Sequence, residues 1–323
     1  MVCIDVHHHF FPADLNKEGS NEKLGWKTPP GTLPWSPGVS LRAMDASGID
    51  IAILSLPALS MGSVSEENRA VTRERNLAMS SIAQQHSGRF GFLGCLPFLD
   101  DIEGVLKEIA YCFDELQADG ISLASSYGVG VHATYIGDDK YDAIWAELHR
   151  RKAVVFLHGA MVASSTPTPH PFLPIPVSEV PNETFRAAAH LVVSGRKRLY
   201  SNVKIILAHL GGTTPSLAPR VSVLSRHMGC PLTPEEILED FKSFYYETAL
   251  SSYDANLVCI DKFVDPSHIL FGTDFPAVSV EMAGWYTKNV RDHYGPEGRK
   301  LEMVFGGNAL ALFPRLQMKQ DIK

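Results

Sequence analysis

The sequence predicts a (β/α)8 TIM barrel, in which eight parallel strands are each followed by a helix. Short runs rich in β-branched residues alternate with stretches of helical period along nearly the whole chain, which is typical of βα units around a parallel sheet. No GxGxxG motif follows the first of these runs, which argues against an open dinucleotide-binding sheet. The 323 residues are many for one domain, but a barrel takes roughly 250 residues and tolerates insertions. We therefore expect residues 1–323 to form a single barrel domain.

Eight candidate strands account for this prediction. In chain order they are Val2–Val6, Asp50–Ser55, Phe90–Leu96, Gly120–Ala124, Ala153–Leu157, Val203–Ala208, Phe244–Thr248 and His268–Phe271. Between them, Val105–Leu116 and Tyr141–Arg151 place apolar residues at three- and four-residue spacing and predict helices. Gly48 and Gly195 are typical of helix C-termini, where glycine readily adopts the left-handed conformation.

Two segments are longer than a barrel connection needs. Asn16–Ser40 follows the first predicted strand and is rich in proline, glycine and tryptophan. Met161–Asn182 follows the fifth predicted strand, is rich in proline and has no helical period. Loops that follow barrel strands lie at the carboxyl-terminal face, where barrels build their active sites. We therefore expect ordered lids or walls over a site, the alternative being disordered surface insertions.

Composition and charge exclude several classes of protein. Hydrophobic residues make up 45% and charged residues 20% of the chain, which is typical of a folded protein with a large core. The net charge is −7, which excludes charge-driven binding to nucleic acid as a main activity. No apolar run is long enough to span a membrane, and the N-terminus lacks the pattern of a secretory signal. Because the five cysteines are scattered and form no CxxC motif, we expect a reducing, cytoplasmic location.

Three consecutive histidines close the first predicted strand. Side chains two apart in a strand share a face, so His7 and His9 point together while His8 points away. Two imidazoles that converge at a strand end make half of a metal site. The alternative is a surface histidine cluster or the remnant of an affinity tag, which would not be expected to complete the opening strand of a barrel.

A residue that can bind a metal follows three further predicted strands. His158 ends the run AVVFLH, His209 ends VKIILAH, and Asp274 follows ILFGT. Taken singly, each is more typical of a loop that caps a strand. Four strands that end in this way would bring their side chains together in the barrel mouth. Such nitrogen and oxygen donors bind a divalent metal and leave one position for water or substrate.

This pattern resembles the metal site of the amidohydrolase superfamily, with HxH after strand one, histidines after strands five and six, and Asp after strand eight. The stretches MDASGIDIAILS, GRFGFLGCLPF, VVFLHG, IILAHLGG, ILFGTDFP and GGNALALF resemble the metal-dependent decarboxylases typified by aminocarboxymuconate semialdehyde decarboxylase. The resemblance runs from Ile4 to Phe313 in the same order. No lysine ends the fourth strand, in GISLASSYG, so the chain resembles the mononuclear branch that lacks a carbamylated lysine.

The resemblance implies one divalent metal per chain, with His7, His9, His158 and Asp274 as its ligands. It implies that His209 lies near the metal, either as a weak ligand or as an acid–base residue. The proton of the reaction would come from His209 or from Asp274, and the sequence leaves both open. Three neutral imidazoles and one carboxylate favour zinc, with manganese as the alternative.

Two arginines and two phenylalanines are candidates for binding a substrate. The resemblance places Arg42, in SLRAMD, near the substrate carboxylate, and it allows Arg220, in HLGGTTPSLAPR, to reach the site of a neighbouring subunit. A guanidinium pairs bidentately with a carboxylate, although each arginine could equally be an ordinary surface residue. Phe11 and Phe275 are candidates for an aromatic pocket wall, with plain core packing as the alternative.

Among the members of that branch, the loops resemble those of the fungal 6-methylsalicylate decarboxylases. The resemblance implies a carboxy-lyase of secondary metabolism that converts a small 2-hydroxybenzoic acid, 6-methylsalicylate, into 3-methylphenol and CO2, as a homodimer or higher homo-oligomer. A metal that holds the phenolic oxygen and one carboxylate oxygen would fix the ring for protonation. Two alternatives remain: hydrolysis of a lactone or amide at the same metal, and a non-catalytic metal-binding or scaffolding barrel.

Overall fold

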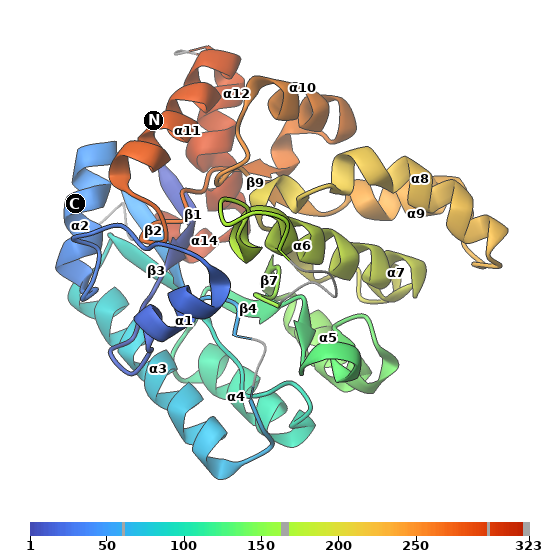
Figure 1. The fold of residues 1–323 in the computed structure, drawn as a ribbon, viewed down its shortest axis with the longest axis horizontal. Helices are drawn as coiled ribbons and strands as arrows, with labels where there is room; N and C mark the ends of the chain where they lie inside the picture. The colour runs from blue at the N-terminus through green and yellow to red at the C-terminus, as the bar shows by residue number, and fades with distance from the viewer. Residues whose placement is uncertain (60–61, 163–167, 296–297, 319–323) are drawn as a thin grey trace.

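The structure is a computed structural model that describes residues 1–59, 62–162, 168–295 and 298–318. Eight parallel strands form one sheet in the order β1-β2-β3-β4-β7-β8-β9-β10 (Figure 1). Their bounds are β1 Ile4–His9, β2 Ile51–Ser55, β3 Phe90–Gly94, β4 Gly120–Ala124, β7 Val154–His158, β8 Lys204–Leu207, β9 Tyr245–Glu247 and β10 Ile269–Leu270. A separate two-stranded antiparallel sheet joins β5 (Ser126–Tyr127) to β6 (Thr134–Tyr135).

The sheet closes into a barrel between its first and last strands. The backbone N–H of Val6 donates to the carbonyl of Phe271 at 3.0 Å, and that of His9 donates to the carbonyl of Phe275 at 2.7 Å. The predicted (β/α)8 barrel is therefore confirmed. Every predicted strand overlaps an observed one, and the largest difference is in β1. That strand begins at Ile4, two residues later than predicted, and it includes all three histidines.

Helices cover the outside of the barrel. The helices of the structure, including those at the two barrel ends, are α1 Lys17–Leu24, α2 Pro37–Ser47, α3 Glu66–Gln85, α4 Ile102–Asp114, α5 Asp142–Arg151, α6 Ile175–Val193, α7 Arg196–Leu199, α8 Thr214–His227, α9 Pro234–Lys242, α10 Asp254–Phe263, α11 Val280–Tyr294, α12 Arg299–Glu302, α13 Asn308–Leu312 and α14 Pro314–Met318, together with the short 3-10 helices η1 Gly130–His132, η2 Asp139–Tyr141, η3 His209–Gly211 and η4 Pro266–His268 and the π-helix η5 Met303–Gly307. The two predicted helices correspond to α4 and α5. Among the described residues, no helix is both long and apolar enough to cross a membrane.

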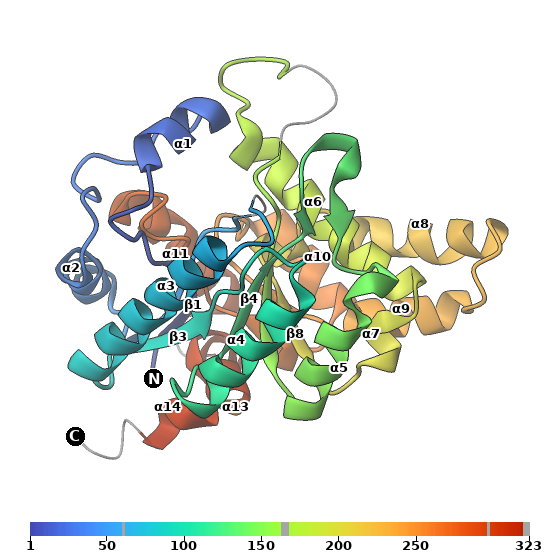
Figure 2. The same ribbon diagram turned by 90° about the horizontal axis from the view of Figure 1, so that it is seen from below.

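The barrel interior and the layer between strands and helices form two apolar clusters. The interior cluster is closed at one end by α13 and α14 and contains Ile4, Val6, Ile51, Ile53, Leu93, Val154, Phe156, Ile206, Ala208, Leu270, Ala309, Phe313 and Leu316. Figure 2 shows α13, α14 and the N-terminus at that end, and α1 and the chain that leads into α6 at the opposite end. The end with α1 and α6 is where the strands finish, so it is the face on which a barrel places its site.

The two long insertions lie at this carboxyl-terminal face. The first contains α1 and the beginning of α2. The second becomes helical at Ile175, so the expectation that residues 161–182 have no helical structure is wrong for its last part. Pro176 lies in the first turn of α6, where a proline N–H would have no helical partner in any case. Residues 163–167 of this insertion lie outside the described residues.

Candidate metal centre

A bulge in β1 aims two histidines into the barrel. Ile4 pairs with the first residue of β2 but His8 pairs with the fourth, so β1 carries one extra residue between these two points. An extra residue in a strand reverses which side chains face inward. Before the bulge, Ile4 points into the barrel and belongs to the interior cluster. After the bulge, His7 and His9 are the residues that face inward. The predicted relation between the histidines is thus seen, and the bulge determines which of the two faces points into the barrel.

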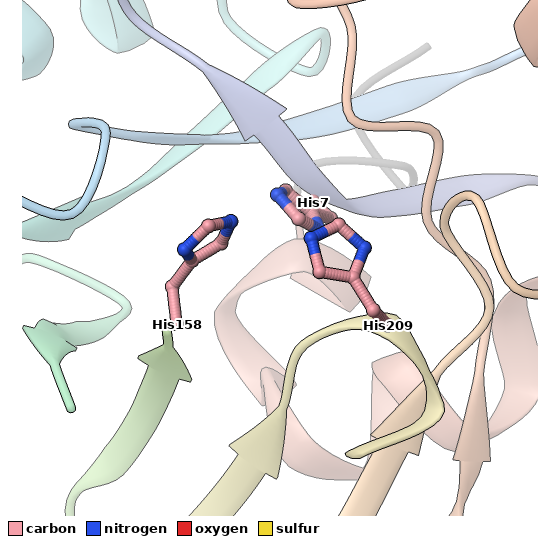
Figure 3. A group of neighbouring side chains, drawn as sticks. All are labelled: His7, His158 and His209. Atoms are coloured by element: carbon pink, nitrogen blue, oxygen red, sulfur yellow. The ribbon is translucent and has the colours of Figure 1, made fainter. Parts of the chain in front are cut away.

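His158, His209 and Asp274 come from three other strand ends. His158 is the last residue of β7, His209 begins η3 just after β8, and Asp274 follows β10. His209 has φ of 58° and Asp274 has φ of 63°, a left-handed backbone conformation that is uncommon for residues other than glycine. Such backbone strain gathers at functional sites, where surrounding contacts hold it in place. Figure 3 shows His7, His158 and His209 converging from separate strands.

These five side chains form one compact cluster. The Nε2 atom of His7 lies 3.1 Å from Nε2 of His9. The Oδ1 atom of Asp274 lies 3.4 Å from Nε2 of His7 and 3.0 Å from Nε2 of His9. One ligand atom from each of His7, His158 and His209 lies within 4.8 Å of the other two. The structure thus brings together all five residues that were predicted to surround a metal.

The second ring nitrogen of three histidines is occupied by an acceptor. Nδ1 of His7 lies 2.9 Å from Oε1 of Glu247, Nδ1 of His158 lies 2.8 Å from the carbonyl of the next residue, and Nδ1 of His209 lies 3.0 Å from the carbonyl of Ala249. Carbonyl oxygens and carboxylates accept hydrogen bonds, so each Nδ1 carries the proton. This tautomer leaves the lone pair on Nε2, the arrangement of metal-binding histidines.

Glu247 of β9 is a residue that the sequence reasoning missed. It is fully buried, and besides the contact with His7 it accepts backbone N–H hydrogen bonds from His209 at 2.5 Å and from Ala249 at 2.7 Å. Burial raises the pKa of this carboxyl to about 7, while His209 and the backbone donors lower it. A side chain at Gly272 would collide with Glu247 and with His7, so glycine is needed there. A charged residue inside the buried run YYETAL was the available signal.

The charges in the cluster and one unpartnered oxygen indicate a place for a cation. Burial lowers the pKa values of His7 and His158 well below the ordinary range, so both rings are neutral. Burial alone would raise the pKa of Asp274, but His7 and His9 outweigh it and hold that pKa below its usual range. The buried Oδ1 of Asp274 has no hydrogen-bond donor among the described residues. An anionic oxygen beside the Nε2 lone pair of His7 is repulsive without a cation, so the residues fit a divalent metal ion.

A cavity of about 310 Å³ opens onto the cluster. Its polar wall includes His9, His158, His209 and Asp274, and most of its remaining wall is apolar. This volume lies at the lower end of the ~300–1,000 Å³ typical of small-molecule sites. The remaining lining residues are Phe11, Lys17, Leu24, Trp26, Pro57, Met161, Pro176, Val177, Val180, Pro181, Leu250, Ser251, Ala277, Met282 and Tyr286. Both long insertions therefore contribute to the wall.

The four predicted substrate residues occupy different places. Phe11 lines the cavity, and its ring stacks on that of His9 with centroids 6.1 Å apart. Phe275 is buried outside the set of lining residues and packs against the ring of His8, with centroids 5.3 Å apart. Arg42 on α2 and Arg220 on α8 are both exposed, and neither belongs to the described residues that line the cavity. Within one chain, Phe11 is thus the only one of the four in contact with the cavity among the described residues.

Comparison with known proteins places the chain in a family. The family model described as amidohydrolase matches residues 4–315. Decarboxylase macB of Penicillium terrestre is 38% identical over 338 residues, 99% of this chain and 97% of that protein. The 6-methylsalicylic acid decarboxylase of Penicillium expansum is 36% identical over 326 residues, 98% of each chain. A dihydroxybenzoic acid decarboxylase of Polaromonas sp. JS666, solved with bound manganese and 2-nitroresorcinol, shares the fold with a TM-score of 0.81 at 22% identity, covering 97% of each chain. As the sequence resemblance implied, this chain belongs to the amidohydrolase family.

Proposed function

We propose that the protein removes CO2 from a small 2-hydroxybenzoic acid, with 6-methylsalicylate as the substrate and 3-methylphenol as the product. The observation that carries the proposal is a buried cluster of inward-facing imidazoles and one carboxylate that opens onto a small, mostly apolar cavity. Such a cavity accepts an aromatic ring, and the cluster accepts the polar groups of the ring. Two relatives at 36% identity, from Penicillium expansum and Aspergillus aculeatus, are named 6-methylsalicylic acid decarboxylases.

The proposed metal ligands are His7, His9, His158 and Asp274, which together would hold one divalent ion per chain. Three neutral imidazoles and one carboxylate favour zinc. Manganese is the alternative, because the dihydroxybenzoic acid decarboxylase with this fold was solved with manganese bound. A bound ion supplies Lewis acidity, which favours the deprotonated phenol and fixes the orientation of a chelating acid. Zinc and manganese contents of the purified protein, measured together, decide between the two.

The reaction needs one proton and no oxidant. The ring carbon that bears the carboxylate accepts a proton, the bond to the carboxylate carbon then breaks, and its electron pair restores the aromatic ring as neutral CO2 leaves. His209 and Asp274 line the cavity and are the proposed proton donors. His209 is held through Nδ1 by the carbonyl of Ala249, so it exchanges protons with the cavity through Nε2. Comparison of His209→Gln with Asp274→Asn, by metal content and by rate, separates a proton donor from a metal ligand.

The assembly and the domain organisation are part of the proposal. Arg220 lies on an exposed face of α8, and Figure 1 shows α8 and α9 extending away from the barrel. An arginine in that position reaches another subunit more readily than the cavity of its own chain. We therefore propose a homodimer or higher homo-oligomer in which Arg220 acts across an interface. We also propose that residues 1–323 form a single domain, with the two long insertions as lids over the cavity.

The direct test incubates metal-loaded protein with 6-methylsalicylate and measures CO2 and 3-methylphenol. The proposal requires both products in equal amounts and none from metal-free protein. A hydrolase of lactones or amides would release no CO2 from this acid. Activity on a lactone or amide panel without any CO2 from salicylates would replace the proposal with that alternative.

A further inference from the structure

A lysine lies in the wall of the cavity, where a lysine is rarely found. Lys17 is only 7% exposed, and among the described residues that line the cavity it is the only lysine or arginine. Lysine side chains are almost never this buried unless they are paired, because burial of an unpaired ammonium is costly. Its long side chain could reach solvent from a surface helix, but here it is directed inward. The burial of Lys17 in the cavity wall therefore suggests that the side chain has a role in what the cavity binds.

Lys17 has an aromatic neighbour and no carboxylate partner. Its Nζ atom lies 4.7 Å from the centroid of the Phe11 ring, a cation–π contact that compensates part of the burial. Among the described residues it has no ion pair or hydrogen bond. Burial lowers the pKa of Lys17, and the charge of Asp274 raises it, so the ammonium is electrostatically linked to the metal cluster. An anion in the cavity would stabilise this ammonium.

The stability of α1 gives no reason for a cation at this position. Lys17 is the first residue of α1, where the helix dipole disfavours positive charge. The start of the helix is already capped, since the side chain of Asn16 accepts the backbone N–H of Gly19 at 2.9 Å. The helix end carries Lys23, which is exposed and lies where the dipole favours a cation. Charge at Lys17 therefore opposes the helix, a local conflict of the kind expected at functional sites.

We propose that Lys17 binds the carboxylate of the aromatic acid, through the oxygen that is not held at the histidine cluster. The inference rests on the proposed function and adds a specificity-determining residue to it. The ring of Phe11 contacts the ammonium of Lys17 on one side and stacks on His9, so the lysine and the cluster border the same part of the cavity. An acid held between them has its carboxylate toward α1. The phenolic product lacks this carboxylate, so Lys17 favours the binding of substrate over that of product.

The test compares Lys17→Met with wild type, with Lys17→Arg as the charge-conserving variant and Lys23→Met as the control on the same helix. Loss of one charge-assisted hydrogen bond should raise KM for 6-methylsalicylate about ten- to a hundredfold. The ring carbon is protonated while the carboxylate is still attached, so the bond is made equally in the ground state and in the transition state of protonation, and kcat should change less than about threefold. Lys17→Arg should recover part of the loss, and Lys23→Met should behave as wild type. Inhibition by 3-methylphenol should be unchanged.

A second measurement is independent of turnover. Calorimetry with 2-hydroxybenzenesulfonate, an anion of similar shape that cannot lose CO2, gives a Kd for each metal-loaded variant, and metal content and circular dichroism control for folding. We expect Lys17→Met alone to lose this binding. Equal binding by Lys17→Met and wild type overturns the inference, as does an equal loss for 3-methylphenol, while CO2 release by wild type leaves the decarboxylase proposal intact. If wild type releases no CO2, the proposed function fails, and the sulfonate still shows whether Lys17 binds anions.

Discussion

Two buried networks of polar side chains lie on opposite faces of β1, one around His8 and one around His7 and His9. They differ in whether all their hydrogen bonds are made. On the outer face, Nδ1 of His8 contacts Oδ2 of Asp5 at 2.9 Å and Nε2 contacts the hydroxyl of Ser40 at 2.8 Å. Asp5 also accepts from the backbone N–H of Thr273 at 3.0 Å, and Ser40 accepts from the indole of Trp35 at 3.0 Å. This outer network thus ties β1 to α2 and to the chain after β10.

On the inner face, the hydrogen bonds of the histidine–aspartate cluster are not all made among the described residues. The ring nitrogens that point outward are bonded, but Nε2 of His7 and of His9 face each other, and Oδ1 of Asp274 has no donor among the described residues. A buried polar network with all its hydrogen bonds made stabilises the fold, whereas an unsatisfied one needs an explanation. Neighbouring histidines of one strand thus have different contacts: His8 links β1 to α2 through Asp5 and Ser40, whereas His7 and His9 belong to the cluster proposed to bind the metal.

The largest effect is expected where an inner-face ligand is removed. His158→Ala should lose the metal and lower kcat/KM by about a thousandfold or more, because the site then lacks a ligand and the positioning that it provides. Metal analysis and a CO2 assay check both parts. If His158→Ala retained the metal and most of the activity, the inner cluster would, like the outer network, have no role in binding the metal.

A change in the substrate should have the next largest effect. Replacement of the 2-hydroxyl by methoxy removes one oxygen ligand to the cluster and the electron donation of the phenolate, both of which act in the transition state. We expect 2-methoxybenzoate to react at least about a hundredfold more slowly than salicylate, a loss of roughly 2.7 kcal/mol in the barrier. Steady-state rates at one metal load give the comparison, and equal rates would rule out chelation through the hydroxyl.

A smaller effect is expected from Arg220→Ala, which touches neither face of β1. Loss of a guanidinium–carboxylate contact across an interface should cost about tenfold or more in kcat/KM. A mixture of Arg220→Ala with Asp274→Ala should regain activity, because a hybrid contains one site with an intact cluster and an intact arginine. If subunits exchange and no activity returns, Arg220 acts within its own chain or only in structure.

The smallest effect on activity is expected from His8→Ala. The variant should keep the metal and stay within about threefold of the wild-type rate, because His8 faces away from the cluster. It should lose about 2–4 kcal/mol of unfolding free energy, since Asp5 remains buried without one of its partners. Urea unfolding of the metal-free proteins measures this loss. A stable but inactive His8→Ala protein would contradict the assignment of the two faces.

The parts of the site that depend on local sequence were predictable, and those that depend on contacts between distant segments were not. Alternation in a strand predicted that His7 and His9 share a face, and strand ends predicted the positions of His158, His209 and Asp274. The bulge in β1 was not predictable, because it depends on pairing with β2 and not on the local sequence.

Other features of the site were missed because they depend on tertiary contacts. The inward direction of Lys17 depends on how α1 packs over the barrel, and its sequence context is that of an ordinary polar helix. The beginning of α6 was not predicted, because Pro176 and Pro181 interrupt the helical spacing of the apolar residues without preventing the helix. Arg42 and Arg220 were singled out through the resemblance alone, and neither is among the described residues that line the cavity.

We propose that the inner face of β1 binds one metal ion and the outer face none, and a paired measurement of metal content distinguishes the two faces. Wild type, His7→Ala and His8→Ala are stripped of metal, incubated with equal zinc and manganese, dialysed and analysed for both elements. We expect about one ion per chain in wild type and in His8→Ala, and almost none in His7→Ala. Two ions per wild-type chain, retention by His7→Ala, or loss from a folded His8→Ala protein would contradict it.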